Sequence, residues 1–261
     1  MKKEKEIINN LVLNTEEELI DYKDYDILFL EIKYCKNLNK FVKIASSMLI
    51  DKIKLHIGYY RNYPGLMWFT HSGFESMSIK KLFKHKVKVL SKLHKGIRGL
   101  DLGIFPLVSK DLDFVKPLVN LRKLSLAVYS GDKNSHPLDL SILGDIKGMT
   151  SIGLWFLDLY LRKYPEGEPI SLETLKTTKH LQKLSIISDA RSNLTDLEVL
   201  ADMQKLEEIR FERIKNIDKF SILLKSDSLK KIYVDKFLFK KIDNKLMQEF
   251  KEKQVLIETS N

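Results

Sequence analysis

The chain has 261 residues and a formal net charge of +10; 44% of its residues are apolar and 31% are charged. This composition is enough for a sizeable core, and no segment resembles a disordered chain or a linker. Cys35 is the one cysteine, which excludes an internal disulfide and fits a reducing compartment. No run of about 18 apolar residues occurs, and no signal-peptide core follows the charged start. We therefore expect a cytoplasmic protein without a membrane span.

Residues 1–24 are expected to form an N-terminal cap. Ile8, Leu11 and Leu13 make a short copy of an L-x-x-L-x-L pattern. In an extended chain the last two of these side chains share one face. Thr15 and Glu18 then have the spacing of a capping box, which predicts a short helix.

The same pattern recurs along the chain at a nearly constant step. Nine matches open at Tyr25, Ile50, Phe74, Ile97, Leu121, Met149, Leu181, Leu206 and Leu229. Their starts lie 25, 24, 23, 24, 28, 32, 25 and 23 residues apart. Since residues three and five places on are also apolar, each match predicts a strand with one buried face. The strands are expected near residues 28–32, 53–57, 77–80, 100–104, 124–128, 152–156, 184–188, 209–213 and 232–235.

The segments between the predicted strands carry apolar residues at steps of three. The clearest run is Leu194, Leu197, Leu200, Met203 and Leu206. This spacing favours short helical or 3₁₀ turns on the side opposite the strands.

A C-terminal cap is expected over residues 238–261. Ile242, Leu246 and Phe250 recur every four residues and so share one face of a helix. The apolar run 255–257 predicts a last edge strand.

The period and the opening triplets resemble those of the leucine-rich repeat family. The resemblance implies an α/β repeat solenoid that is curved, with a parallel sheet on its concave face and irregular or short helical convex segments. It implies one solenoid, with a cap at 1–24, about nine repeats over 25–237 and a cap at 238–261. The family places Asn or Cys at the ninth position, to satisfy backbone groups at the turn. Here those positions hold Lys33, Gly58, Leu82, Phe105, Tyr129, Leu157, Asp189, Ile214 and Phe237, so this is a divergent sequence without an Asn ladder.

No pattern in the sequence predicts catalysis. There is no phosphate-binding loop and no H-E-x-x-H or C-x-x-C motif, and the six histidines lack metal-ligand spacing. The segment 130–137 combines Ser, Asp and His, but its residue types are those of turns. We therefore expect no enzyme activity, no cofactor and no metal.

A basic run covers residues 80–98, with no Asp or Glu between Glu75 and Asp101. Its candidate anion-binding residues are Lys80, Lys81, Lys84, Lys86 and Lys88. Such a run could track phosphates of nucleic acid or an anionic membrane. The favoured interpretation is a solvated convex surface, because no exposed aromatic residues interleave with the lysines for base stacking.

The outward positions of the strands suggest where a partner binds. Ser125 and Gly153 belong to a floor of small residues in the central repeats, and Trp155 stands above it, beside Ile187 and Arg210. An exposed tryptophan is typical of interface hot spots, although an indole that turns into the core is the alternative. Tyr129, Tyr160 and Tyr164 lie in the two longest repeats, whose insertions are expected to flank the same surface.

The resemblance and this surface together favour a non-catalytic module that binds another protein and is itself a monomer. One alternative is an immunity or inhibitor protein that neutralises a toxin. Another is a nucleic-acid-associated protein that uses the basic run 80–98, although nucleic acid is the less favoured partner.

Overall fold

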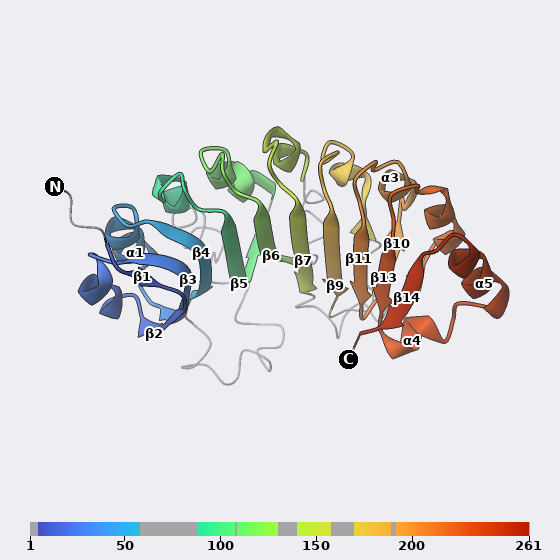
Figure 1. Cartoon of the computed structure of the whole chain (residues 1–261), viewed down its shortest axis with the longest axis horizontal. Helices are drawn as coiled ribbons and strands as arrows, with labels where there is room; N and C mark the ends of the chain where they lie inside the picture. Colours follow the sequence, from blue (N-terminus) through green and yellow to red (C-terminus); the bar gives the residue numbers. More distant parts are fainter. Residues whose placement is uncertain are drawn as a thin grey trace, which may run out of the picture. The chain divides into compact units, whose positions relative to one another are not determined.

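The computed structural model describes residues 5–57, 88–107, 109–129, 140–157, 170–188 and 192–260. The chain divides into two compact units, whose helices and strands are labelled in Figure 1. Unit 1 comprises Met1–Phe105 and Lys110–Leu124, and unit 2 comprises Pro106–Ser109 and Ser125–Asn261. Among the described residues, no helix has the length and apolar content that crossing a membrane requires.

Unit 1 is built on parallel strands that follow one another in sequence. They are β1 (Ile7–Ile8), β2 (Leu11–Thr15), β3 (Asp26–Cys35), β4 (Ile50–Ile57) and β5 (Gly99–Leu107). β1 and β2 both pair with β3, β3 pairs with β4, and β4 pairs with β5. Between them lie η1 (Glu18–Tyr22), α1 (Leu38–Ala45) and η2 (Lys88–Lys92), and η3 (Ser109–Val115) follows β5. These helical segments return the chain to the same edge, which makes neighbouring strands parallel.

Unit 2 repeats this plan. Its large sheet contains β7 (Ser151–Leu157), β9 (Lys183–Ser188), β11 (Glu208–Glu212), β13 (Lys231–Val234) and β14 (Leu256–Thr259), all parallel. β6 (Lys123–Tyr129) crosses the division between the units after Leu124. A second parallel sheet contains β8 (Ile170–Ser171), β10 (Asn193–Thr195) and β12 (Asn216–Ile217). The helical elements are η4 (Ser141–Asp145), η5 (Glu173–Leu175), α3 (Glu198–Ala201), η6 (Phe220–Lys225), α4 (Lys236–Phe239) and α5 (Asn244–Glu252).

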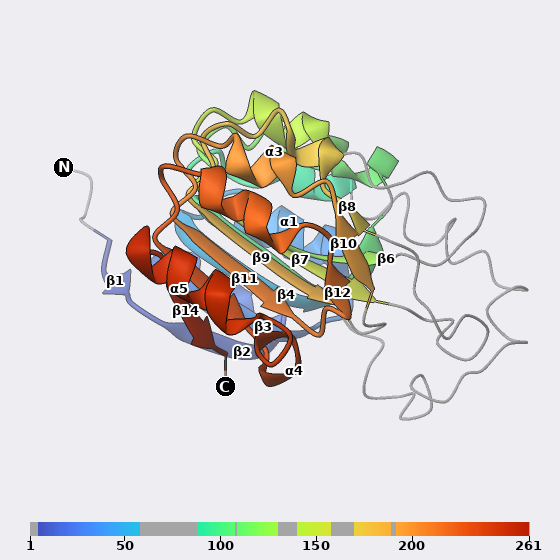
Figure 2. The ribbon, with the colours of Figure 1, turned by 90° about the vertical axis from the view of Figure 1, so that its right-hand side faces the viewer.

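The expected repeat pattern is confirmed in the described residues. Strands occur at every predicted position except 77–80, which lies outside the described residues. Leu124, Leu126, Ile152, Leu154, Leu184 and Ile186 are all buried, as the alternation predicts. In the repeats that contain β7, β9 and β11, a strand of the small sheet (β8, β10 or β12) follows the large-sheet strand, and a helical turn lies on the other side of the core (Figure 2).

The apolar steps of three also have the expected role. Leu194 lies in β10 and Leu200 in α3. Both side chains are fully buried, as is Leu206 just before β11. The turns on this side therefore close the core with the residues that the spacing identified.

The first repeat starts two residues later than the sequence pattern suggested. Ile27 pairs with Ile50 across β3 and β4, and Leu30 pairs with Ile53. Both Ile27 and Leu30 are buried, whereas Leu28 is 44% exposed. The assignment of Tyr25, Leu28 and Leu30 as the opening triplet was wrong, because pairing with β4 selects the later of two apolar registers.

This correction changes which residues occupy the ninth position, at the turn. Counting from Ile27 places Cys35 there instead of Lys33, and counting from Ile8 in the N-terminal copy places Glu16 there. The Glu16 side chain is 1% exposed. Its carboxylate accepts hydrogen bonds from the backbone N–H groups of Lys36 at 2.9 Å and Asn37 at 2.8 Å. A glutamate thus satisfies the backbone at a position where the leucine-rich repeat family uses Asn or Cys.

The capping box predicted at Thr15 forms in part. The Glu18 carboxylate accepts the Thr15 backbone N–H at 3.1 Å, as in a capping box. The Thr15 hydroxyl donates to the same carboxylate instead of accepting an N–H of the following turn, which is a 3₁₀ helix. Glu18 therefore anchors the turn while Thr15 does not cap it.

At the C-terminus, α5 and β14 form where the sequence predicted a helix and a last strand. Phe250 is fully buried and packs edge-on against Phe220, with ring centroids 5.6 Å apart. Leu246, one turn earlier in α5, is half-buried. Ile242 is also half-buried, but it precedes the N-cap Asp243 and lies outside the helix, so the prediction that it shares the helical face of Phe250 was wrong. Among these three apolar residues, only Phe250 is fully covered.

We expect Ile186→Ala to lower the free energy of unfolding by about 2–5 kcal/mol, because it removes a fully buried side chain and leaves a cavity. Urea unfolding followed by circular dichroism measures this loss. The matched control is Gln182→Ala, an exposed position just before the same strand, which should change stability by less than about 0.5 kcal/mol. Equal effects of the two variants would contradict the repeat core.

Glu16→Ala should destabilise the chain by about 2–4 kcal/mol, because two partly buried backbone N–H groups lose the acceptor that the buried Glu16 carboxylate provides. The adjacent Glu17→Ala is the control. Glu17 pairs with Lys40 at the surface, and exposed pairs contribute little. Chemical unfolding of both variants tests the difference, and a loss in Glu17→Ala as large as in Glu16→Ala would contradict the role of Glu16.

Candidate functional site

The candidate site is the outward face of the large sheet in unit 2. Because inward and outward side chains alternate along each strand, burying Ile152, Leu154 and Leu184 leaves every second residue outward. The outward residues are Ser151, Gly153 and Trp155 on β7, Lys183, Ser185 and Ile187 on β9, Glu208, Arg210 and Glu212 on β11, Lys231 and Tyr233 on β13, and Leu256 and Glu258 on β14.

Trp155 stands over a low part of this face. Its side chain is 39% exposed and lies beside Ile187, its register partner on β9. Gly153 pairs with Ser185, and a Cβ on Gly153 would lie 3.2 Å from the Ser125 hydroxyl oxygen. A side chain at this position would crowd the Ser125 hydroxyl, and the glycine leaves the indole as the largest side chain of the group.

The half of the face nearer the C-terminus is polar, and its charges are paired. Ion pairs join Lys183 to Glu208 at 2.7 Å, Arg210 to Glu212 at 3.3 Å, and Lys231 to Glu258 at 2.8 Å. Because opposite charges alternate across the strands, this half has little net charge.

Two cations of this polar half lie against the ring of Tyr233. The Arg210 guanidinium lies 5.0 Å and the Lys231 ammonium 4.6 Å from the centre of its ring. The hydrogen bond to Glu258, followed by that to Tyr233, raises the pKa of Lys231 to about 12. The side chains of this half are thus held in place by their neighbours on the sheet.

The structure brings together five of the predicted partner-binding residues. Ser125, Gly153, Trp155, Ile187 and Arg210 lie on neighbouring strands of this face, and the expected outward orientation of Trp155 is confirmed. The inward alternative for the indole is therefore wrong.

Other predicted site residues fall wholly or partly outside the described residues. They are Tyr160, Tyr164, Lys80, Lys81, Lys84 and Lys86; Tyr129 and Lys88 lie at the ends of β6 and η2, where their side chains are not described. The flanking contacts of Tyr129, Tyr160 and Tyr164 and the role of the basic run 80–98 therefore stay predictions.

Sequence reasoning missed the contribution of Tyr233, Lys231 and Glu258. Alternation places Tyr233 outward, but its contacts with Arg210 and Lys231 depend on the register of β11 and β13. Nothing in one strand alone reports which residues lie across from it. The signal appears only when the repeats are aligned with one another.

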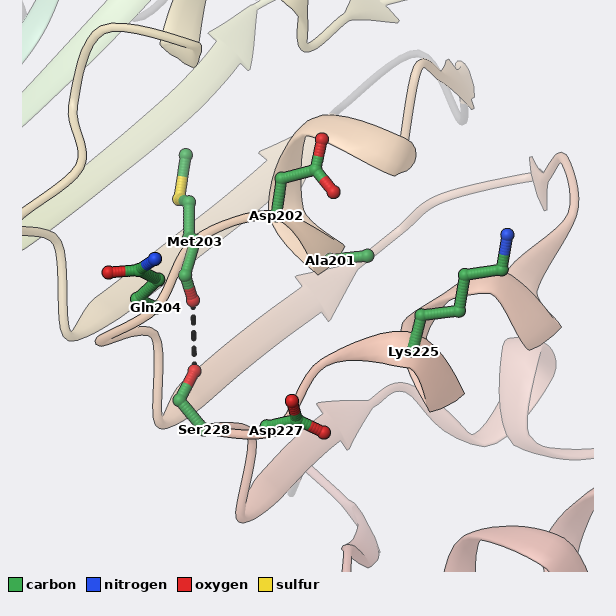
Figure 3. Close-up of a pocket in the computed structure, with 7 residues that line it drawn as sticks. All are labelled: Ala201, Asp202, Met203, Gln204, Lys225, Asp227 and Ser228. Carbon is green, nitrogen blue, oxygen red and sulfur yellow. Dashed lines mark hydrogen bonds between the residues drawn. The ribbon is translucent and has the colours of Figure 1, made fainter.

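A cavity of about 380 Å³ between the turns at 201–204 and 225–228 shows no arrangement for catalysis (Figure 3). The side chains of Asp202, Lys225 and Asp227 do not converge on one point. The Ser228 hydroxyl lies 2.9 Å from the Met203 carbonyl and 3.0 Å from the Leu206 carbonyl, so it satisfies the backbone of the preceding repeat. Over the described part of the chain, no group of three His, Cys, Asp or Glu side chains is placed to hold a metal.

Cys35 is the one thiol of the chain, and it is fully buried. Burial raises the pKa of the Cys35 thiol to about 12, and the negative charge of Glu16 acts in the same direction. Because the thiolate is the reactive form, Cys35 belongs to the core and not to a reactive site.

We expect iodoacetamide at pH 8 to alkylate Cys35 at least about a hundredfold more slowly in the folded chain than in urea, where the thiol pKa returns to about 8.5. As pH rises, the Cys35 thiol loses its proton at a lower pH in the unfolded chain than in the folded one. The Cys35 contribution to the free energy of unfolding is therefore complete below about pH 8.5 and declines as the pH rises toward 12. Mass spectrometry measures the alkylation, and Cys35→Ala should remove the decline. Equal rates in the folded and unfolded chains would contradict this burial.

Comparison with known proteins identifies the fold. No protein-family model matches the chain, and no curated protein sequence does either. A structure of internalin C2 from Listeria monocytogenes is 17% identical, with a TM-score of 0.48 over 85% of this chain and 76% of the internalin chain. The structure of the Drosophila Toll–Spatzle complex is 10% identical, with a TM-score of 0.50 over 90% of this chain and 28% of that chain.

The fold is a leucine-rich repeat fold. At these identities the likeness extends to the fold alone, and this chain spans less than a third of the matched chain of the Toll complex. The repeat spacing of the sequence had predicted this fold.

Proposed function

We propose that this leucine-rich repeat chain is a non-catalytic module that binds another protein through the outward face of unit 2. The observation that carries the proposal is Trp155, 39% exposed beside Ile187 above the small residues Gly153 and Ser185. An exposed indole above a low floor can be enclosed by a partner, and such aromatic anchors provide much of the energy of protein interfaces.

The paired charges support a protein partner over nucleic acid. Lys183, Arg210 and Lys231 each face a carboxylate on the same surface. Lysines and arginines bind a nucleic-acid backbone by neutralising its phosphates, which releases the counterions of the nucleic acid. Cations that already pair with carboxylates of the same surface are less suited to this. The Toll neighbour was solved in a complex with Spatzle, and recognition of a protein by a leucine-rich repeat fold is in keeping with the proposal.

The proposal includes Tyr129, Tyr160 and Tyr164 as flanking contacts and a monomeric chain in a reducing, cytoplasmic setting. An immunity protein that neutralises a toxin would be one case of the same activity. The second candidate, nucleic-acid binding through residues 80–98, is supported by the absence of acidic residues between Glu75 and Asp101. Nucleic-acid affinity that fell steeply with salt would favour it.

The test is to capture the partner from the native cells, identify it by mass spectrometry, and titrate the purified partner by calorimetry. Trp155→Ala should weaken binding by about 2 kcal/mol or more, a factor of about 30, with an unchanged circular dichroism spectrum. Val119→Ala, at an apolar position in unit 1 that is 61% exposed, is the matched control and should leave affinity within about twofold. Unchanged affinity in Trp155→Ala would place the site elsewhere.

A further inference from the structure

A second cavity in unit 2 lies away from the outward face, where the segment 216–220 meets α4 and α5. Its volume is about 210 Å³, below the range of about 300–1,000 Å³ usual for whole small-molecule ligands, so it suits a single side chain. The lining residues are Asn216, Ile217, Phe220, Leu238, Lys241, Ile242, Asp243 and Leu246.

The cavity is lined by apolar side chains that the C-terminal segment leaves partly exposed. Phe250 is fully buried, but Leu246 in α5 and Ile242 just before the helix are half-buried and line the cavity, as does the half-buried Ile217. These aliphatic side chains form an apolar floor that an inserted side chain would cover.

One cation is fixed at this cavity. The Lys241 ammonium donates to the Lys215 carbonyl at 2.7 Å and to the Asn216 side-chain oxygen at 2.7 Å. It also lies 4.4 Å from the centre of the Phe237 ring, which is 45% exposed. The two hydrogen bonds use two of the three N–H donors, so the charge is already oriented before a ligand arrives.

The surrounding charge is positive. Segments 215–219 and 236–246, which border the cavity, contain six lysines and two aspartates. Two of these lysines pair with carboxylates outside the segments, Lys219 with Glu198 at 3.5 Å and Lys245 with Glu249 at 3.9 Å, so the excess positive charge comes from the other lysines. One of the two aspartates, Asp243, is the N-cap of α5, and its carboxylate accepts the Leu246 N–H at 2.7 Å. The cavity therefore combines an apolar floor with a cationic rim, which is complementary to an apolar side chain flanked by carboxylates.

We propose that this cavity is a second binding site, which takes a large apolar side chain from an acidic peptide segment of a protein partner. The side chain fills the cavity over Ile217, Ile242 and Leu246, and a neighbouring carboxylate meets Lys241. A peptide fits better than an anionic membrane, because membrane contact requires a broad exposed apolar face. Within the stretch 211–250, Phe237 is the one exposed large apolar residue.

The test uses the full chain and a fluorescein-labelled heptapeptide with a central leucine between three glutamates on each side, followed by fluorescence anisotropy. We expect saturable binding that weakens by about tenfold or more when serine replaces the central leucine. Lys241→Met should weaken binding by about tenfold, while Lys251→Met, at an exposed lysine in the last turn of α5, should have no effect.

A second variant, Leu246→Trp, fills the cavity without removing charge and should also abolish binding, with folding checked by thermal denaturation. Trp155→Ala should leave peptide binding unchanged, which separates this site from the outward face. The proposal is overturned if no saturable binding occurs, if the serine peptide binds equally, or if Lys241→Met and Lys251→Met behave alike. Binding to phosphatidylserine vesicles but not to the peptide would overturn it in favour of a membrane surface.

Discussion

Every other feature depends on the stacking of inward side chains from one repeat to the next. A single strand with one apolar face cannot bury that face by itself, so each triplet packs against the triplet beside it. The register shows this directly, since Leu184 lies between Ile152 and Ile209 on the neighbouring strands. All three are buried, and their alignment sets the position of each turn that follows.

Stacking constrains the inward positions and leaves the outward ones free to vary. In unit 2 that freedom produces two different halves: an apolar group around Trp155 and a network of paired charges around Tyr233. Because the paired charges neutralise one another, they would orient a bound partner more than attract it. The apolar half around Trp155 is the part that suits an aromatic hot spot of a protein interface.

The ends of the repeat array meet the same constraint in different ways. At the first turn, the carboxylate of Glu16 accepts two backbone N–H groups from the next repeat. At the last, Phe250 closes the core against Phe220, while Ile242 and Leu246 stay partly uncovered. A cap that closes the core incompletely leaves an apolar cavity, and the lysines around it supply a charge that the outward face lacks.

The sequence by itself determined the repeat period, because the apolar triplet recurs at a nearly constant step, and it determined which faces of most strands are buried, because inward and outward residues alternate. It left open whether the Trp155 indole points outward, and the structure decided this. Only the tertiary structure decided between Tyr25 and Ile27 as the start of the first repeat, since both registers are apolar and pairing with Ile50 selects one. It likewise revealed Glu16 as a turn ligand. The Tyr233 network and the cavity at Lys241 join residues from different repeats, and such contacts arise only when the repeats pack together.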